Sequence, residues 1–158
     1  MKRISLTQRK YAIVDNADYE KLKLYNWYAV DTYKNSFYAC RSFSKNGKVY
    51  MHREILNASK RQLIDHKDGN GLNNQRSNLR FCTHAENMRN RKKTIGLSSQ
   101  YLGVCWHKQI KCWYASISVN KKIKYLGIFK TEIKAAKAYN KAAIIYHGEF
   151  ARLNIISD

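Results

Sequence analysis

The chain has 158 residues, of which 44 % are hydrophobic and 13 % aromatic, and this composition excludes a wholly disordered protein. It carries 30 Lys and Arg against 11 Asp and Glu, so its formal net charge is +19. Such an excess points to a polyanion, usually nucleic acid, or to an anionic membrane surface. We expect no membrane span and no signal peptide, because no apolar run is long enough, and therefore a cytoplasmic protein.

The first sixty residues are typical of a small α+β portion that is rich in strands. Asp15 or Asn16 can cap a short helix, and Asn46-Gly47 is a common hairpin turn. Aromatic and small apolar residues favour strands on either side of these signals. The predicted strands are residues 10–15, 27–33, 37–43 and 48–52.

The next segment, DHKDGNGLNNQRSNLRFCTHAEN at 65–87, is rich in Asn, Gly and Asp, which favour turns. Its ends have the apolar content of strands, and Thr83 with Glu86 three residues later forms a capping box. The segment therefore predicts strand, loop, strand and helix within about thirty residues. The expected elements are strands at 62–66 and 79–82, a turn at 68–71, and a helix at 83–91.

Three side chains of this segment suit phosphodiester hydrolysis with one metal ion. Asp65 and His66 leave the first strand on opposite faces, because side chains alternate along a strand, and Asn87 projects from the first turns of the helix. Carboxylate and amide oxygens are ligands for a hard cation such as Mg²⁺. A neutral imidazole can deprotonate the attacking water near pH 7.

A polar, basic connector follows at 89–100 and fits a linker that touches DNA. Residues 87–131 contain ten Lys or Arg and no acidic residue. From 113 to 119 apolar and polar residues alternate, which predicts a half-buried strand, and 123–129 returns as another strand. Thr131 can cap a helix that ends at Gly148. We expect a three-stranded antiparallel sheet packed on one helix.

The 65–87 segment resembles the HNH endonuclease motif, in the variant in which Asn replaces the last His. It is similar to phage and intron-encoded homing endonucleases with a ββα-metal finger, and His66, Asn78 and Asn87 match the three defining positions. The resemblance implies His66 as general base, Asp65 and Asn87 as ligands of one Mg²⁺ or Mn²⁺ ion, and Asn78 as a brace of the loop. It also implies that Arg80 faces a phosphate.

Residues 101–158 resemble an Apetala-type (ethylene-response-factor) DNA-binding domain, whose sheet lies in the major groove of DNA. The matching pieces include Gly103-Val104, Trp113, Tyr125-Leu126-Gly127 and the Ala135–Tyr139 part of the helix. Cys105 and His107 stand where plant members have guanine-binding arginines, and Ser116 and Ser118 where further charged residues are usual. The lysines therefore predict salt-dependent affinity for DNA more than a preference for particular base sequences. The candidate DNA contacts are Arg80, Arg89, Arg91, Lys92, Trp106, His107, Lys108, Lys111, Ser116, Lys124 and Tyr125.

These features predict an α+β protein with a small N-terminal β-rich portion (1–60), a ββα-metal finger (61–92), a basic linker (93–100) and a C-terminal Apetala-type domain (101–158). We expect a metal-dependent endonuclease that nicks double-stranded DNA, with no protein partner and as a monomer or weak dimer. His52, just before the finger, is expected to be structural. The alternatives are a non-catalytic DNA-binding regulator and, less favoured, an RNA-binding protein.

Overall fold

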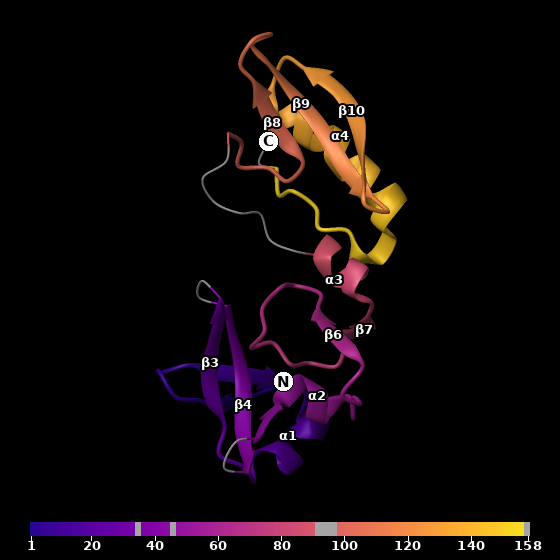
Figure 1. Cartoon of the computed structure of the whole chain (residues 1–158). Coiled ribbons are helices and arrows are strands. Elements are labelled where there is room, and N and C mark those ends of the chain that lie inside the picture. Colours follow the sequence, from indigo (N-terminus) through magenta and orange to yellow (C-terminus); the bar gives the residue numbers. More distant parts are fainter. Residues whose placement is uncertain (34–35, 45–46, 91–97, 157–158) are drawn as a thin grey trace. The chain divides into compact units, whose positions relative to one another are not determined.

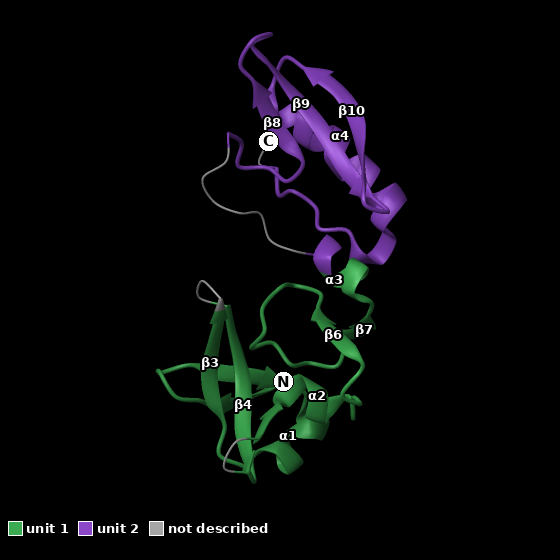
Figure 2. Ribbon diagram, viewed as in Figure 1, with its two compact units in different colours: residues 1–87 green, residues 88–158 purple. Residues whose placement is uncertain are grey.

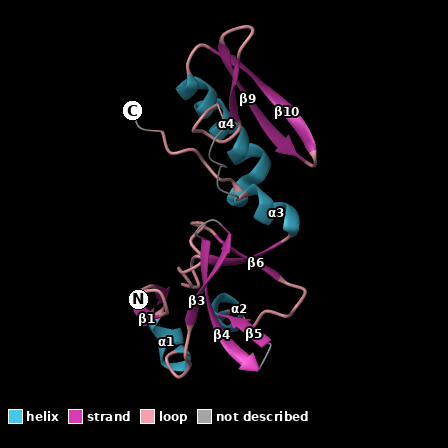
Figure 3. Ribbon diagram, turned by 60° about the vertical axis from the view of Figure 1, so that its left-hand side comes forward, coloured by secondary structure: helices cyan, strands magenta, loops and turns pink. Residues whose placement is uncertain are grey.

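The computed structural model describes residues 1–33, 36–44, 47–90 and 98–156. The chain divides into two compact units, residues 1–87 and 88–158 (Figure 2). Helices and small antiparallel sheets occur together, which confirms the α+β class (Figure 3). No helix in the described ranges is long and apolar enough to cross a membrane.

The N-terminal part of unit 1 contains a two-stranded and a three-stranded antiparallel sheet and two short helices (Figure 1). Their elements are β1 (Lys2–Ser5), β2 (Tyr11–Val14), α1 (Asn16–Leu22), β3 (Tyr28–Tyr33), β4 (Ser36–Ser44), β5 (Gly47–Tyr50) and α2 (Met51–Ile55). The sequence did not indicate β1. The predicted strand at 48–52 ends early, because Met51, His52 and Ile55 lie on the buried side of α2. Asn46, in the predicted hairpin turn, lies outside the described residues.

One hydrophobic core holds unit 1 together. Val14 and Leu22 from its beginning, Trp27 and Met51 from its middle, and Leu79 near its end all belong to the same buried cluster. Trp27 also donates its indole N–H to the carbonyl oxygen of Leu22, at 2.8 Å. Residues on both sides of position 60 therefore fold around a shared interior.

The HNH-like segment folds as strand, loop, strand and helix, as predicted. Its elements are β6 (Leu63–His66), β7 (Leu79–Cys82) and α3 (His84–Arg89), with β6 and β7 antiparallel. The capping box is present: Glu86 accepts from the backbone N–H of Thr83 at 2.7 Å, and the Thr83 hydroxyl accepts from Glu86 N–H at 3.3 Å. This cap fixes where the chain turns from β7 into α3.

Unit 2 contains the expected three-stranded antiparallel sheet and one long helix (Figure 1). Its elements are β8 (Val104–His107), β9 (Cys112–Val119), β10 (Lys122–Phe129), α4 (Glu132–His147) and a 3₁₀ helix (Gly148–Phe150). Thr131 caps α4 by accepting from Lys134 N–H. The strand order is β10-β9-β8, and α4 packs mainly on β9.

Small residues let α4 lie close to the sheet. Ala135, Ala136 and Ala143 are fully buried against Ala115 and neighbouring core residues. Gly103, just before β8, has φ +68°, and a Cβ added there would lie 2.0 Å from the Tyr139 ring and 2.5 Å from the carbonyl oxygen of Ser116. The close approach of helix and sheet thus depends on the absence of a side chain at this position.

Gly103→Ala should destabilise unit 2 by about 4 kcal/mol, because the new methyl overlaps a ring and a backbone oxygen and the left-handed φ disfavours it. Gly148→Ala is the matched control, since Gly148 has φ +55° but no atom within 4 Å of the added Cβ. Only the backbone cost of about 1–2 kcal/mol is expected there. Urea unfolding measures both; equal losses in the two variants would contradict the packing argument.

Candidate active site

Asp65 and Arg80 face each other across the β6–β7 ladder. They are cross-strand partners, and the Asp65 Oδ2 atom accepts from Arg80 Nε at 2.9 Å and from Nη2 at 2.6 Å. Both side chains are almost fully buried. The expected metal ligand is therefore bound to a guanidinium, and the arginine expected at a phosphate contacts a carboxylate instead. Breaking such a buried pair by removing one partner leaves an uncompensated charge.

His66 lies on the opposite face of β6 from Asp65 and is only 5 % exposed. Its Nε2 lies 3.4 Å from Oδ1 of the buried Asn74. Burial lowers the pKa of His66, although the hydrogen bond to Asn74 and the carboxylates of Asp68 and Asp65 act in the other direction. The imidazole is therefore neutral at pH 7, the form a general base requires.

Two aromatic side chains from outside the HNH-like segment contact His66. Its ring centroid lies 5.1 Å from that of His52 on α2 and 5.6 Å from that of Tyr38 on β4, both edge to face. Tyr50 completes the cluster through contacts with Tyr38 and His52. Sequence reasoning treated His52 as structural and did not select Tyr38, because no local pattern links β4 and α2 to β6.

His52 is itself buried, and burial, with the neighbouring His66 and Arg53, lowers its pKa to about 3. Within the described part of the chain its Nδ1 atom is buried without a hydrogen-bond partner. His52 is therefore uncharged and packs its ring against the His66 ring. Protonation of His52 in the folded state would be costly.

Asn78 and Asp68 organise the loop between β6 and β7. The Asn78 side chain accepts from the backbone N–H of Asp68 at 3.1 Å and donates to the Asp68 carboxylate at 3.0 Å and to the carbonyl of Asn73 at 2.8 Å. Burial opposes ionisation of Asp68, but hydrogen bonds from Asn70, Asn73 and Asn78 prevail and lower its pKa. The sequence predicted the turn at 68–71 from this Asp-Gly-Asn context, but it did not single out Asp68 as a site residue.

Asn87 lies in α3 with an exposed side chain, and its backbone N–H donates to the carbonyl of Thr83 at 3.0 Å. Cys82, the last residue of β7, precedes this helix. Burial raises the pKa of Cys82, and the carboxylates of Asp65 and Glu86 raise it further.

The donor chemistry of Asp65 and Asn87 fits a hard divalent cation. Within the described ranges, no three His, Cys, Asp or Glu side chains gather into a potential metal site. Mg²⁺ nevertheless needs few protein ligands, because it keeps several waters and uses phosphate oxygens of the substrate. One carboxylate and one amide oxygen match that mode of binding.

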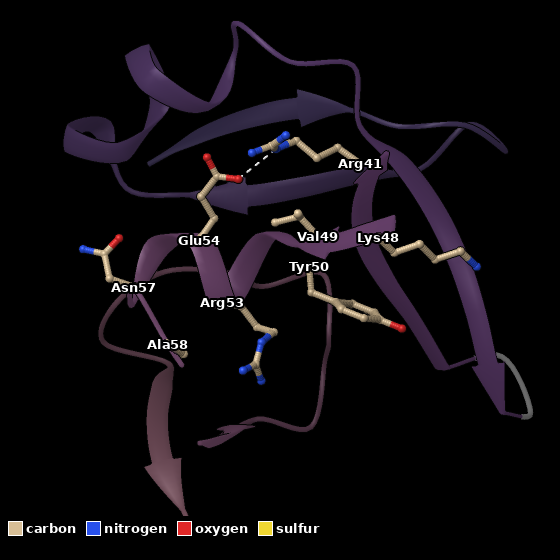
Figure 4. A pocket seen from close by; sticks show the side chains of 8 residues that line it. All are labelled: Arg41, Lys48, Val49, Tyr50, Arg53, Glu54, Asn57 and Ala58. Carbon is tan, nitrogen blue, oxygen red and sulfur yellow. Dashed lines mark hydrogen bonds and ion pairs between the residues drawn. The ribbon is translucent and has the colours of Figure 1, made fainter. Parts of the chain in front are cut away.

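A cavity of about 400 Å³ between β4, β5 and α2 is a separate feature (Figure 4). Two of its lining cations hold the surrounding structure: Arg41 pairs with Glu54 at 2.9 Å, and Arg53 donates to the carbonyls of Ser59 and Gln62. These bonds join β4 to α2 and α2 to the segment that precedes β6. We therefore assign this cavity no ligand.

In unit 2 the sheet separates the candidate DNA contacts onto two faces. Trp106 pairs with Trp113 on the helix side, with ring centroids 5.0 Å apart, and Lys124 Nζ donates to the Tyr146 hydroxyl on α4 at 2.8 Å. Ser116 and Tyr125 are cross-strand partners on the other face. DNA contact by Trp106 and Lys124 stays a prediction, but neither side chain lies on the face opposite α4.

The remaining candidates lie at turns or near the connector. His107 ends β8 half-buried, Lys108 and Lys111 are exposed in the β8–β9 turn, and Arg89 is half-buried at the end of α3. The candidates Arg91 and Lys92, and residues 93–97 of the expected linker, lie outside the described residues.

Comparison with known proteins finds relatives for the HNH-like segment and for a larger part of the chain. Residues 61–89 match the family model described as HNH endonuclease. Protein 3.8 of Escherichia phage T7 is 30 % identical over 95 residues, which cover 56 % of this chain and 73 % of the phage protein. The chain belongs to the family of T7 protein 3.8. The HNH match covers residues 61–89, which include β6, β7 and α3.

Plant proteins also match this member of the protein 3.8 family. APETALA2-like protein 2 of Oryza sativa subsp. indica is 44 % identical over 59 residues, 36 % of this chain and 13 % of the rice protein. The AP2-like ethylene-responsive transcription factor PLT2 of Arabidopsis thaliana is 44 % identical over 63 residues, 37 % and 11 % of the two chains. The chain thus spans about an eighth of the plant relatives' length. No solved structure matches it significantly.

The lowered pKa of His52 makes unit 1 sensitive to acid. The unfolded chain takes up this proton near pH 6.5 and the folded chain only near pH 3, so stability is full above pH 6.5 and falls below it, by up to about 1.4 kcal/mol per pH unit. Urea unfolding of unit 1 at pH 7 and pH 4.5 measures the loss.

His52→Phe keeps an aromatic ring but cannot titrate, so it should reduce this acid loss. The control is His84→Phe, because His84 is exposed at the start of α3 and should leave the loss unchanged. An undiminished acid loss in His52→Phe would contradict the assignment.

Proposed function

We propose that this protein is a divalent-metal-dependent DNA endonuclease of the HNH homing type that nicks double-stranded DNA. The observation that carries the proposal is the buried, neutral His66, which follows Asp65 on β6 and precedes the loop that Asn78 braces, within the segment that matches the HNH model. In this proposal a finger of residues 61–92 hydrolyses the bond, and residues 101–158 anchor the duplex.

His66 would act as the general base. Because Oδ1 of Asn74 can only accept a hydrogen bond, Nε2 of His66 carries the hydrogen, and Nδ1 would accept the proton of the attacking water. The edges of the Tyr38 and His52 rings restrict rotation of the imidazole and keep bulk water from its buried side. Such restriction reduces the entropy lost when the reacting groups align.

Asp65 and Asn87 would hold the metal ion, which when bound offsets negative charge on the phosphate and on the leaving oxygen. Arg80 would contact both a ligand of the metal ion and the substrate. Its guanidinium already neutralises the Asp65 carboxylate. A guanidinium has five donors and can bind a phosphate oxygen while it keeps one bond to the carboxylate. Arg80 would thus order Asp65 and approach the scissile phosphate.

Unit 2 would supply affinity. Residues 87–131 carry ten Lys or Arg and no acidic residue, and Lys108 and Lys111 are exposed at a hairpin end. Contacts between lysine and phosphate give salt-dependent affinity without sequence choice. A single site per chain favours nicks, and two sequential nicks if two chains act together. The HNH endonuclease match and the matches to APETALA2-like plant proteins support DNA as the partner.

A non-catalytic DNA-binding regulator is the rival function. It explains the basic surface and the similarity to plant transcription factors. It gives no reason for an acid–histidine pair on adjacent positions of β6 or for an Asn-rich loop ordered around it. We therefore favour the nuclease.

A plasmid assay tests the proposal. With Mg²⁺ or Mn²⁺ the protein should convert supercoiled plasmid to open circles, and EDTA should stop it. His66→Ala should lower the rate about 10³-fold, because the general base is lost. His84→Ala removes an exposed histidine of the same segment and should leave the rate unchanged. Tight DNA binding without cleavage in any divalent metal would support the regulator instead.

The pH dependence gives a second test. Because burial lowers the pKa of His66, its base form persists at lower pH than that of a free histidine. The acidic half-maximum of the nicking rate at saturating metal and DNA should therefore lie below pH 6.5. A half-maximal rate at or above pH 6.5 on the acidic side would show that another group supplies the base.

A further inference from the structure

The face of the unit 2 sheet opposite α4 has an unusual composition. We call it the open face and define it by six residues that the strand register places side by side in three cross-strand pairs. The pairs are Tyr114 with Ile128, Ser116 with Tyr125, and Ser118 with Ile123. None of the six is charged, although the whole chain carries +19.

Large apolar side chains of the open face are exposed to solvent. Ile123 is 80 % exposed, Tyr125 60 % and Ile128 52 %, and all three lie on β10. Their β9 partners include two serines, so a shallow polar strip runs beside an apolar ridge. Contiguous exposed apolar surface rimmed by polar residues usually marks a binding surface.

Lysines stand at both ends of the open face. Lys108 and Lys111 lie in the turn between β8 and β9, and Lys121 lies in the turn between β9 and β10, at the opposite end of β9. Lys111 and Lys121 have φ +49° and +64°, so both belong to tight turns. No acidic residue occurs between 87 and 131, so nothing on these strands offsets the lysines.

This arrangement is complementary to the major groove of duplex DNA. The groove admits a β-sheet, its floor is uncharged, and phosphates border it on both sides. The apolar group on that floor is the 5-methyl group of thymine, whereas G·C pairs present only hydrogen-bonding groups there. Isoleucine placed against a G·C edge would desolvate donors and acceptors without pairing them.

We propose that the open face binds A·T-rich duplex DNA by packing Ile123 and Ile128 against thymine 5-methyl groups, while Lys108, Lys111 and Lys121 contact the flanking phosphates. The hydroxyls of Ser116 and Ser118 are small enough to let the sheet approach, and serine can pair with either kind of base pair. This inference rests on the proposed function of unit 2 as a DNA anchor and adds a base preference to it.

Deoxyuridine provides the direct test, because it lacks only the 5-methyl group of thymine. Binding of the full-length chain in EDTA to a 20-bp A·T-rich duplex is compared with binding to the same duplex containing deoxyuridine, by fluorescence anisotropy at two salt concentrations. Each contacted methyl should contribute about fourfold in affinity. A G·C duplex should bind more weakly and should gain affinity when its cytosines carry a 5-methyl group.

Matched variants assign the effect to the open face. Ile123→Ser with Ile128→Ser should abolish the difference between thymine and deoxyuridine, while the salt-dependent affinity for any duplex remains. Ile144→Ser with Ile145→Ser is the control, because these isoleucines are 58 % and 73 % exposed on α4. The control should keep the full difference.

The outcomes separate this inference from the proposed function. Equal affinity for thymine and deoxyuridine duplexes would overturn the methyl contact and leave the endonuclease proposal standing. Absence of binding to every duplex would overturn both. Self-association that Ile123→Ser dissolves, without any base preference, would assign the open face to a second copy of the chain and also overturn the inference.

Discussion

The loop between β6 and β7 is held against β2 by backbone hydrogen bonds, and the candidate active site depends on this docking. Ile13 N–H donates to the carbonyl of Leu72 at 2.9 Å, and Asn74 N–H donates to the carbonyl of Ile13 at 2.8 Å. Asn74 is thereby fully buried, with its side-chain oxygen toward His66. Two backbone bonds in the interior thus set the position of the side chain that faces the proposed general base.

Acidic residues of α1 and its cap secure the far side of the same loop. The Asp15 carboxylate accepts from Gln75 Nε2 at 3.1 Å and from Arg76 N–H at 2.8 Å, and Arg76 also pairs with Asp18. The hydrogen bonds to Arg76 and Gln75 lower the pKa of Asp15. A loop that has many Asn and Gly residues is therefore ordered by charge-assisted bonds to the N-terminal portion, which explains why the HNH-like segment shares a core with it.

The two units distribute charge differently, and this difference suits their proposed roles. In unit 1 several carboxylates are paired inside the protein, as Asp65 is with Arg80 and Glu54 with Arg41. The strands of unit 2 contain no acidic residue, so Lys108 and Lys111 keep their full positive potential. In a buried ion pair the mutual attraction offsets the desolvation of both charges and fixes the two side chains, whereas surface lysines attract a polyanion over a Debye length.

The sequence by itself determined the features that depend on neighbouring residues. The capping box of Thr83 and Glu86, the alternation along β9 and the cap of α4 at Thr131 follow from spacings of a few positions, and all are present. Only the tertiary structure decided that the Tyr38 ring packs against His66 and that Arg80 binds Asp65. Burial and cross-strand pairing depend on which distant segments pack together, and local patterns do not contain that information.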